Sequence, residues 1–262
     1  MASSEARQTR LMLTSGTALV LIFTQQGFVF AADGLELDTF GKARDRSSRK
    51  IFPLRREVAF SCAGFRSVRN GKTKFELPRT VCEAFEQAAK SFSGDFKKLA
   101  EEMGARVRAE LVELKEQKII ESYPKNEYAD WFARILLAGF FDGKPNAAQL
   151  SFCCLEGAVV CQLEIRDVPG SFAYAGPETV WTALVHNSDA KVAPYRKEAF
   201  DKMGHSLDAL DGPNLEEATL VAQNYVRACS DPAVHKAYPE CKAIGGNMQS
   251  ATITLEKGFF WM

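Results

Sequence analysis

Two apolar runs dominate the pattern near the start of the chain. Residues 17–23 and 28–32 are apolar at almost every position, and only a short polar segment, TQQG, separates them. Strands that are apolar throughout, rather than at alternate positions, are buried on both faces. The pattern therefore predicts a hairpin of two buried strands, and it predicts a third buried strand over residues 58–63.

The middle of the chain changes to a helical period. Residues 80–92 carry apolar side chains at the spacing of one helical face, and a second helix is expected to be capped near residues 93–95 and to continue with the same spacing. We expect these helices to form one antiparallel layer. The polar segment before them, residues 66–78, is interpreted as their link to the first sheet.

Strands return after the helices. Residues 133–141, 148–155 and 158–165 are predicted strands, and Glu156–Gly157 forms a tight hairpin turn between the last two. Pro177 suits the first turn of a further helix.

The last part of the chain mixes one helix with a closing hairpin. Residues 191–212 are polar and are expected to be irregular, whereas Asn214 with Glu217 three residues later is typical of a capping box at a helix start. Residues 243–261 alternate around Ala251, Ile253 and Leu255 and turn near Lys257–Gly258, which indicates a final hairpin.

Charge and composition exclude some classes of function. Among 262 residues, 33 are Lys or Arg and 33 are Asp or Glu, so no net field favours nucleic acid or an anionic membrane. No apolar stretch is long enough to span a bilayer. The histidines His186, His205 and His235 are scattered without metal-ligand spacing, so neither a metal nor a cofactor is expected. The seven cysteines include no CxxC pair and are interpreted as reduced thiols of a cytoplasmic protein.

Four positions in the first quarter of the chain carry the candidate chemistry. They are Thr17 in a Gly16–Thr17 pair, Asp33 at the end of AAD, Lys50 in a Lys-Ile pair, and Gly64 in CAG. In order and in spacing, with one residue of slippage at Lys50, they resemble the start of a proteasome-type β subunit. That family consists of N-terminal-nucleophile (Ntn) hydrolases, and this chain would be a divergent member, with a bacterial origin as one option.

The resemblance implies an α+β fold, a four-layer αββα sandwich, over about residues 16–261. Strands buried on both faces suit it, because each sheet packs on the other sheet inside and on helices outside. It also implies two regions: a propeptide-like segment, 1–16, and a single domain, 17–262. Autocleavage before Thr17 would make this residue the N-terminus of the mature chain.

The resemblance gives each residue a chemical role. A threonine hydroxyl is a weak nucleophile, and the free α-amine of Thr17 would accept its proton near neutral pH. Lys50 would stabilise the developing alkoxide charge, and Asp33 would keep Lys50 charged and oriented. The Gly64 N–H would point at the tetrahedral oxyanion. The implied activity is that of a threonine endopeptidase or amidase acting on peptides or proteins, in a ring-forming homo- or hetero-oligomer.

The sequence departs from the family where a serine, an aspartate and a second serine support the terminal amine. The first serine's place is taken by Ala175, and no aspartate or serine in register precedes Gly245–Gly246. Asp231 and Ser230 lie too far upstream to fill these roles.

Three alternatives remain open from the sequence. Thr14 or Ser15 replaces Thr17 as the nucleophile if the register differs. The chain is a non-catalytic subunit of the same fold if the missing support abolishes activity. It is an exported binding protein if the basic residues before the first apolar run and the small pair Ala31–Ala32 form a signal peptide, although TQQG interrupts that apolar region.

Overall fold

The fold is taken from a computed structural model of the chain. It describes residues 17–37, 42–70, 73–118, 131–186, 188–201, 203 and 212–262. The expected propeptide-like segment, 1–16, and the alternative nucleophiles Thr14 and Ser15 lie outside the described residues, as does His205.

Two five-stranded sheets form the centre of the molecule, and every pairing within them is antiparallel. The first sheet has the order β12 (Phe172–Ala175), β1 (Leu19–Thr24), β2 (Gly27–Ala32), β13 (Gln249–Thr254) and β14 (Gly258–Trp261). The second has the order β11 (Ala158–Arg166), β10 (Lys144–Leu155), β9 (Trp131–Phe141), β6 (Val58–Gly64) and β5 (Ile51–Arg55).

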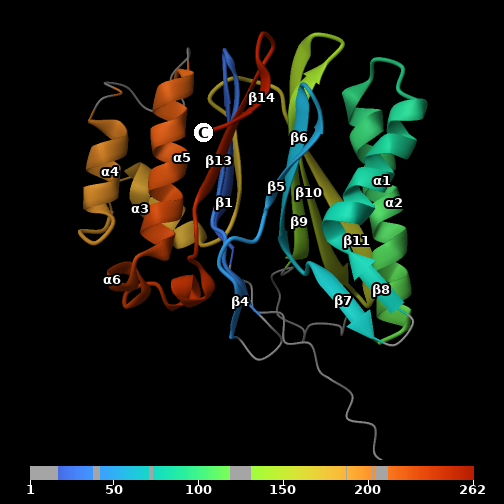
Figure 1. The fold of residues 1–262 in the computed structure, drawn as a ribbon, viewed down its shortest axis with the longest axis horizontal. Coiled ribbons are helices and arrows are strands. Elements are labelled where there is room, and N and C mark those ends of the chain that lie inside the picture. Colours follow the sequence, from blue (N-terminus) through green and yellow to red (C-terminus); the bar gives the residue numbers. More distant parts are fainter. Residues whose placement is uncertain are drawn as a thin grey trace, which may run out of the picture.

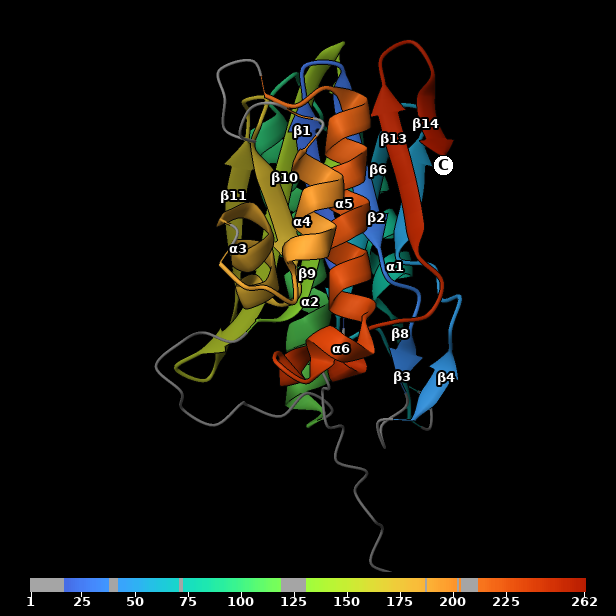
Figure 2. The ribbon, with the colours of Figure 1, turned by 90° about the vertical axis from the view of Figure 1, so that its left-hand side faces the viewer.

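Helices cover the outer face of each sheet, so the described chain forms four layers (Figure 1). Helices α1 (Leu77–Lys90) and α2 (Phe96–Glu116) pack on the second sheet, and α3 (Glu178–His186), α4 (Ala193–Phe200) and α5 (Leu215–Ser230) pack on the first. Figure 2 shows α5 lying along the strands of the first sheet. A third apolar cluster, which includes Leu21, Phe30 and Leu136, fills the space between the sheets. The fold is thus α+β with antiparallel sheets.

The β1–β2 hairpin lies inside the first sheet, and all twelve of its strand positions are buried. This explains why both apolar runs lack alternation, since each face of the hairpin meets another layer. The turn is held by the Thr24 hydroxyl, which donates to the Gly27 carbonyl at 3.1 Å. Gly27 has a φ of 144°, and a Cβ there would overlap the carbonyl of Ile253 on β13. The predicted buried hairpin is confirmed.

Other predicted elements are also present. Asp95 caps α2 through the Lys98 N–H, and Asn214 and Glu217 form the capping box of α5. Two expectations need correction. Residues 193–200 form helix α4 within the segment expected to be irregular, because Pro194 begins its first turn and Ala199 packs into the core. The segment interpreted as a link contains a small hairpin, β7 (Ser67–Asn70) with β8 (Thr73–Glu76).

The remaining described elements are short. Strands β3 (Glu36–Leu37) and β4 (Ala43–Asp45) pair beyond the end of the first sheet, while α6 (Pro232–His235) and the 3₁₀ helix η1 (Pro239–Ala243) connect α5 to β13.

Candidate functional site

The register of the β1–β2 hairpin brings Thr17 and Asp33 to the same end of the first sheet. Leu19 pairs with Ala32, so the next residues outward, Ala18 and Asp33, face each other. The Asp33 N–H donates to the Ala18 carbonyl at 2.9 Å, and the Ala18 N–H donates to Asp33 Oδ1 at 2.9 Å. A two-residue turn in this register thus accounts for the spacing between Thr17 and Asp33.

Asp33 is fully buried but well supplied with hydrogen-bond donors. Its Oδ2 accepts the N–H of Leu35 at 3.1 Å and that of Gly245 at 3.3 Å. Oδ1 accepts the Ala18 N–H and also the ammonium of Lys50. Four donors on two oxygens offset the desolvation of a carboxylate that has no contact with water.

Lys50 comes from the other sheet, immediately before β5, and bridges the other two residues. Its Nζ lies 2.7 Å from Asp33 Oδ1 and 3.4 Å from Thr17 Oγ1. The side chain is 6% exposed and that of Asp33 is 0% exposed. Thr17 itself is half-buried, so its hydroxyl lies at the outer end of a buried ion pair.

Burial and the ion pair act in opposite directions on the two charges. Burial lowers the pKa of Lys50, and the neighbouring Asp33 carboxylate opposes that change. Burial raises the pKa of Asp33, and Lys50 and the backbone N–H donors oppose it. The lowered pKa of Lys50 brings this ammonium closer to the range in which it can release a proton.

A glutamine from the first sheet fixes the backbone around Lys50. Gln249, the first residue of β13, accepts the Lys50 N–H at 3.1 Å and donates to the Ser48 carbonyl at 2.7 Å. The Lys50 carbonyl in turn accepts the N–H of Cys62 on β6 at 3.2 Å. Lys50 is therefore held from both sheets.

Gly64 ends β6 two residues beyond Cys62, at the same end of the sandwich. It has a φ of 88°, and a Cβ would lie 2.3 Å from the carbonyl oxygen of Phe132 on β9. Only glycine fits there without displacement of the backbone. The structure brings Thr17, Asp33 and Lys50 into direct contact; among the described residues, no hydrogen bond joins Gly64 to these three.

A polar network lies beside Lys50 that the sequence analysis did not identify. Ser48 donates to Glu36 Oε2 at 2.6 Å, and Arg66 contacts both Ser48 and Glu36, the latter at 3.2 Å. Glu36 lies three positions after Asp33, Ser48 two positions before Lys50, and Arg66 two positions after Gly64. The three segments that carry the candidate site are thus tied together by their side chains.

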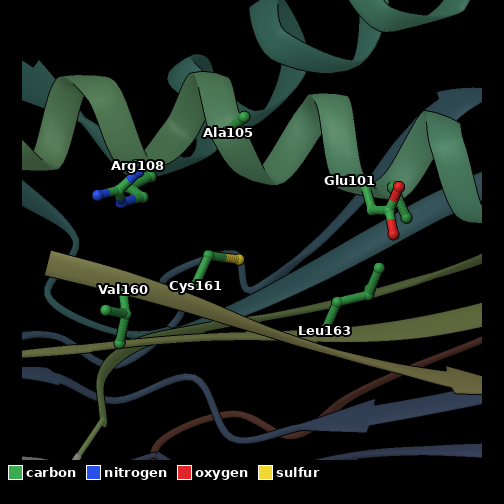
Figure 3. Close-up of a pocket in the computed structure, with 7 residues that line it drawn as sticks. Glu101, Ala105, Arg108, Val160, Cys161 and Leu163 are labelled. Carbon is green, nitrogen blue, oxygen red and sulfur yellow. The ribbon is translucent and has the colours of Figure 1, made fainter. Parts of the chain in front are cut away.

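Two of the hollows formed by the described residues lie elsewhere, and neither is lined by the candidate residues. One, of about 300 Å³, lies between Arg55, at the end of β5, and the aromatic side chains of Phe85 and Phe92. Arg55, Arg56 and Glu57 line this hollow at the other end of β5 from Lys50. The second, of about 370 Å³, lies between α2, which contributes Ala105 and Arg108, and β11, which contributes Val160 and Cys161 (Figure 3).

The residues considered from the sequence as supports for the α-amine of Thr17 have other surroundings in the structure. Ala175 is buried and offers a methyl group, Asp231 caps α6 and accepts the Tyr195 hydroxyl, and Ser230 donates to the Val226 carbonyl.

Within the described ranges no cluster of three or more His, Cys, Asp or Glu side chains has the geometry of a metal site. All seven cysteines are free. No helix in the described part of the chain is long and apolar enough to cross a membrane.

Comparison with models of known protein families and with curated proteins finds no match for this chain.

Proposed function

We propose that the chain is an Ntn hydrolase of the proteasome β type, a threonine peptidase or amidase whose nucleophile is the hydroxyl of Thr17. The observation that carries the proposal is the position of Lys50 Nζ, within 2.7 Å of Asp33 and 3.4 Å of the Thr17 hydroxyl. The four-layer arrangement of helices and antiparallel sheets supports it as well.

The proposed reaction begins with maturation. The Thr17 hydroxyl attacks the carbonyl carbon of Gly16, the C–N bond breaks with the proton passing to the nitrogen, and water hydrolyses the resulting ester. The freed α-amine of Thr17 then serves as the general base for substrate. The hydroxyl proton moves to the amine, the oxygen forms an acyl ester with the substrate carbonyl, the leaving amine takes the proton, and water releases the acid.

Lys50, Asp33 and Gly64 have separate roles in the proposed reaction. The ammonium of Lys50 stabilises the developing negative charge on Thr17 Oγ1, and Asp33 holds that ammonium in place. The Gly64 N–H is proposed as a donor to the oxyanion, the role that the resemblance to the family implies for this glycine. The proposed substrates are peptides or proteins, and assembly into a ring of identical or related subunits belongs to the same proposal.

The exported alternative conflicts with the packing. Cleavage near Ala32 would remove β1 and β2, two adjacent interior strands whose positions are all buried. Loss of this hairpin would expose one face of each neighbouring layer, so the arrangement favours a mature chain that retains it.

The test is the N-terminal sequence and intact mass of the purified protein, before and after treatment with a peptide epoxyketone. This reagent reacts with the hydroxyl and the free α-amine of an N-terminal threonine together. We expect a chain that begins at Thr17 and gains the mass of one label. Thr17→Ala should remain unprocessed and take no label.

Two other results would contradict the proposal. A wild-type chain that begins at Met1 or Ala2 and takes no label would be a non-catalytic subunit. One that begins near Ala32 or Asp33 would be an exported protein.

A further inference from the structure

A second polar group lies close to Thr17, where the chain passes from β12 into α3. The turn there is Gly176–Pro177, and Gly176 has a φ of 154°. A Cβ on Gly176 would lie 2.6 Å from the carbonyl oxygen of Thr17 and 2.6 Å from the hydroxyl of Tyr225. The backbone of Thr17, the turn and the tyrosine hydroxyl therefore meet at one point, which only glycine leaves open.

Tyr225 comes from the middle of α5 and is completely buried. Its ring packs edge-on against Trp181 at 5.4 Å and against Tyr174 at 6.4 Å, which fixes the direction of its hydroxyl. The hydroxyl lies 3.5 Å from the Pro177 carbonyl, a distance at the long limit of a hydrogen bond. A buried tyrosine hydroxyl needs a hydrogen-bond partner, and a phenylalanine ring would fill the same space without that requirement. The hydroxyl therefore calls for an explanation beyond packing.

Two buried cysteines lie in the same apolar cluster as the tyrosine. Cys229 is one helical turn further along α5, and Cys241 lies on η1. Burial holds the pKa values of Tyr225 and Cys229 well above their ordinary ranges, so both groups stay protonated and neutral. Among the hydrogen bonds of the described residues, the Tyr225 hydroxyl therefore has one acceptor, the carbonyl of the Gly176–Pro177 turn.

We propose that Tyr225 is a positioning residue for Thr17: its hydroxyl, directed by the packing of its ring on Trp181 and Tyr174, fixes the Gly176–Pro177 turn against the peptide group through which Thr17 enters β1. The inference rests on the proposed function of Thr17. It gives the nucleophile a second point of attachment, on a neutral hydroxyl, in a chain where Ala175 offers only a methyl group. A small displacement of a reacting group lowers a rate by up to about a hundredfold, so this attachment affects reactivity more than affinity.

The test compares Tyr225→Phe with Tyr195→Phe. Both substitutions remove one tyrosine hydroxyl from the same helical side of the sandwich, but the Tyr195 hydroxyl bonds Asp231 and not the turn. The measured quantities are the maximal labelling rate of Thr17 by the peptide epoxyketone and the reagent concentration at half that rate. We expect Tyr225→Phe to lower the maximal rate about tenfold with the half-rate concentration unchanged within about twofold. Tyr195→Phe should leave both unchanged.

A second pair of variants keeps the test decisive if Tyr225→Phe does not fold. Gly176→Ala places a methyl group where the Thr17 carbonyl, the turn and the Tyr225 hydroxyl meet, whereas the methyl group of Gly258→Ala meets a backbone carbonyl of Arg56 in another part of the fold. We expect Gly176→Ala to label several times more slowly than the wild type and Gly258→Ala to label at the wild-type rate. Equal rates for the two tyrosine variants, or for the two glycine variants, would overturn the positioning role while the proposed function stands. Absence of labelling in the wild type would instead overturn the proposed function, and this inference with it.

Discussion

The two sides of Thr17 are both buried and polar, yet one is charged and the other is neutral. On one side Asp33 and Lys50 form an ion pair, and Asp33 receives three backbone N–H groups in addition to the ammonium. On the other side the Tyr225 hydroxyl donates to the Pro177 carbonyl at 3.5 Å, and it is buried in an apolar cluster that includes Cys229 and Cys241. Charge is thus buried where the backbone supplies donors, and neutral groups are used where it does not.

Removal of the ammonium should have the largest effect. We expect Lys50→Met to lower the labelling rate of Thr17 at least a hundredfold, because the charge developing on Oγ1 loses its partner. It should also lower the free energy of unfolding by about 3–5 kcal/mol, since Asp33 is left buried without a counter-ion. Labelling kinetics and denaturant unfolding measure the two effects.

A double variant separates these effects. Asp33→Asn with Lys50→Met removes both charges and keeps an oxygen for the Ala18 N–H, but its amide NH2 faces the N–H groups of Leu35 and Gly245. It should therefore recover part of the stability and none of the reactivity. A Lys50→Met protein that labels within tenfold of the wild-type rate would show that the charged side serves the fold alone.

A methyl group at Gly64 should have a smaller effect, and mainly on stability. Gly64→Ala should cost about 1–3 kcal/mol for its positive φ, with a further cost because the Cβ meets the Phe132 carbonyl. Gly143→Ala is the matched control, as Gly143 has a φ of 74° and nothing within 4 Å of an added Cβ. Thermal unfolding of the two variants measures the difference. Equal losses would mean that the backbone of β9 yields to the methyl group at no cost.

The pH dependence of labelling should show the smallest effect and should distinguish the two sides. The rate should rise as the Thr17 amine loses its proton, near the ordinary α-amine pKa of about 8. It should fall again as Lys50 loses its proton, and burial brings this second limb below the ordinary lysine value of 10.5. Tyr225 and Cys229 stay protonated throughout, so Tyr225→Phe should leave the alkaline limb in place. An alkaline limb at or above 10.5 would contradict the lowered pKa of Lys50.

Much of the fold could be predicted from the sequence because its strongest signals are local. The uninterrupted apolar runs predict strands buried on both faces, and the Asn214–Glu217 capping box fixes the start of α5. Helix α4 was missed because its polar residues carry almost no helical periodicity, and only Ala199 among them is buried.

The candidate site divides in the same way. Thr17 and Asp33 are brought together by one hairpin, so their spacing alone is informative. Gln249 and Gly245 contact Lys50 and Asp33 from about two hundred residues away, and no local pattern indicates that distance. For Tyr225 the helical periodicity of α5 indicates which face the residue lies on, but not where its hydroxyl points.

The bridge made by Lys50 has a consequence for the order of events in the life of the chain. Thr17 and Asp33 belong to one sheet and Lys50 to the segment leading into the other, so the three meet only after the two sheets have docked. A half-folded chain therefore carries no ammonium beside its threonine. If maturation depends on that ammonium, a free Thr17 amine appears only after the two sheets have packed together. The rate of processing then reports the rate of this folding step.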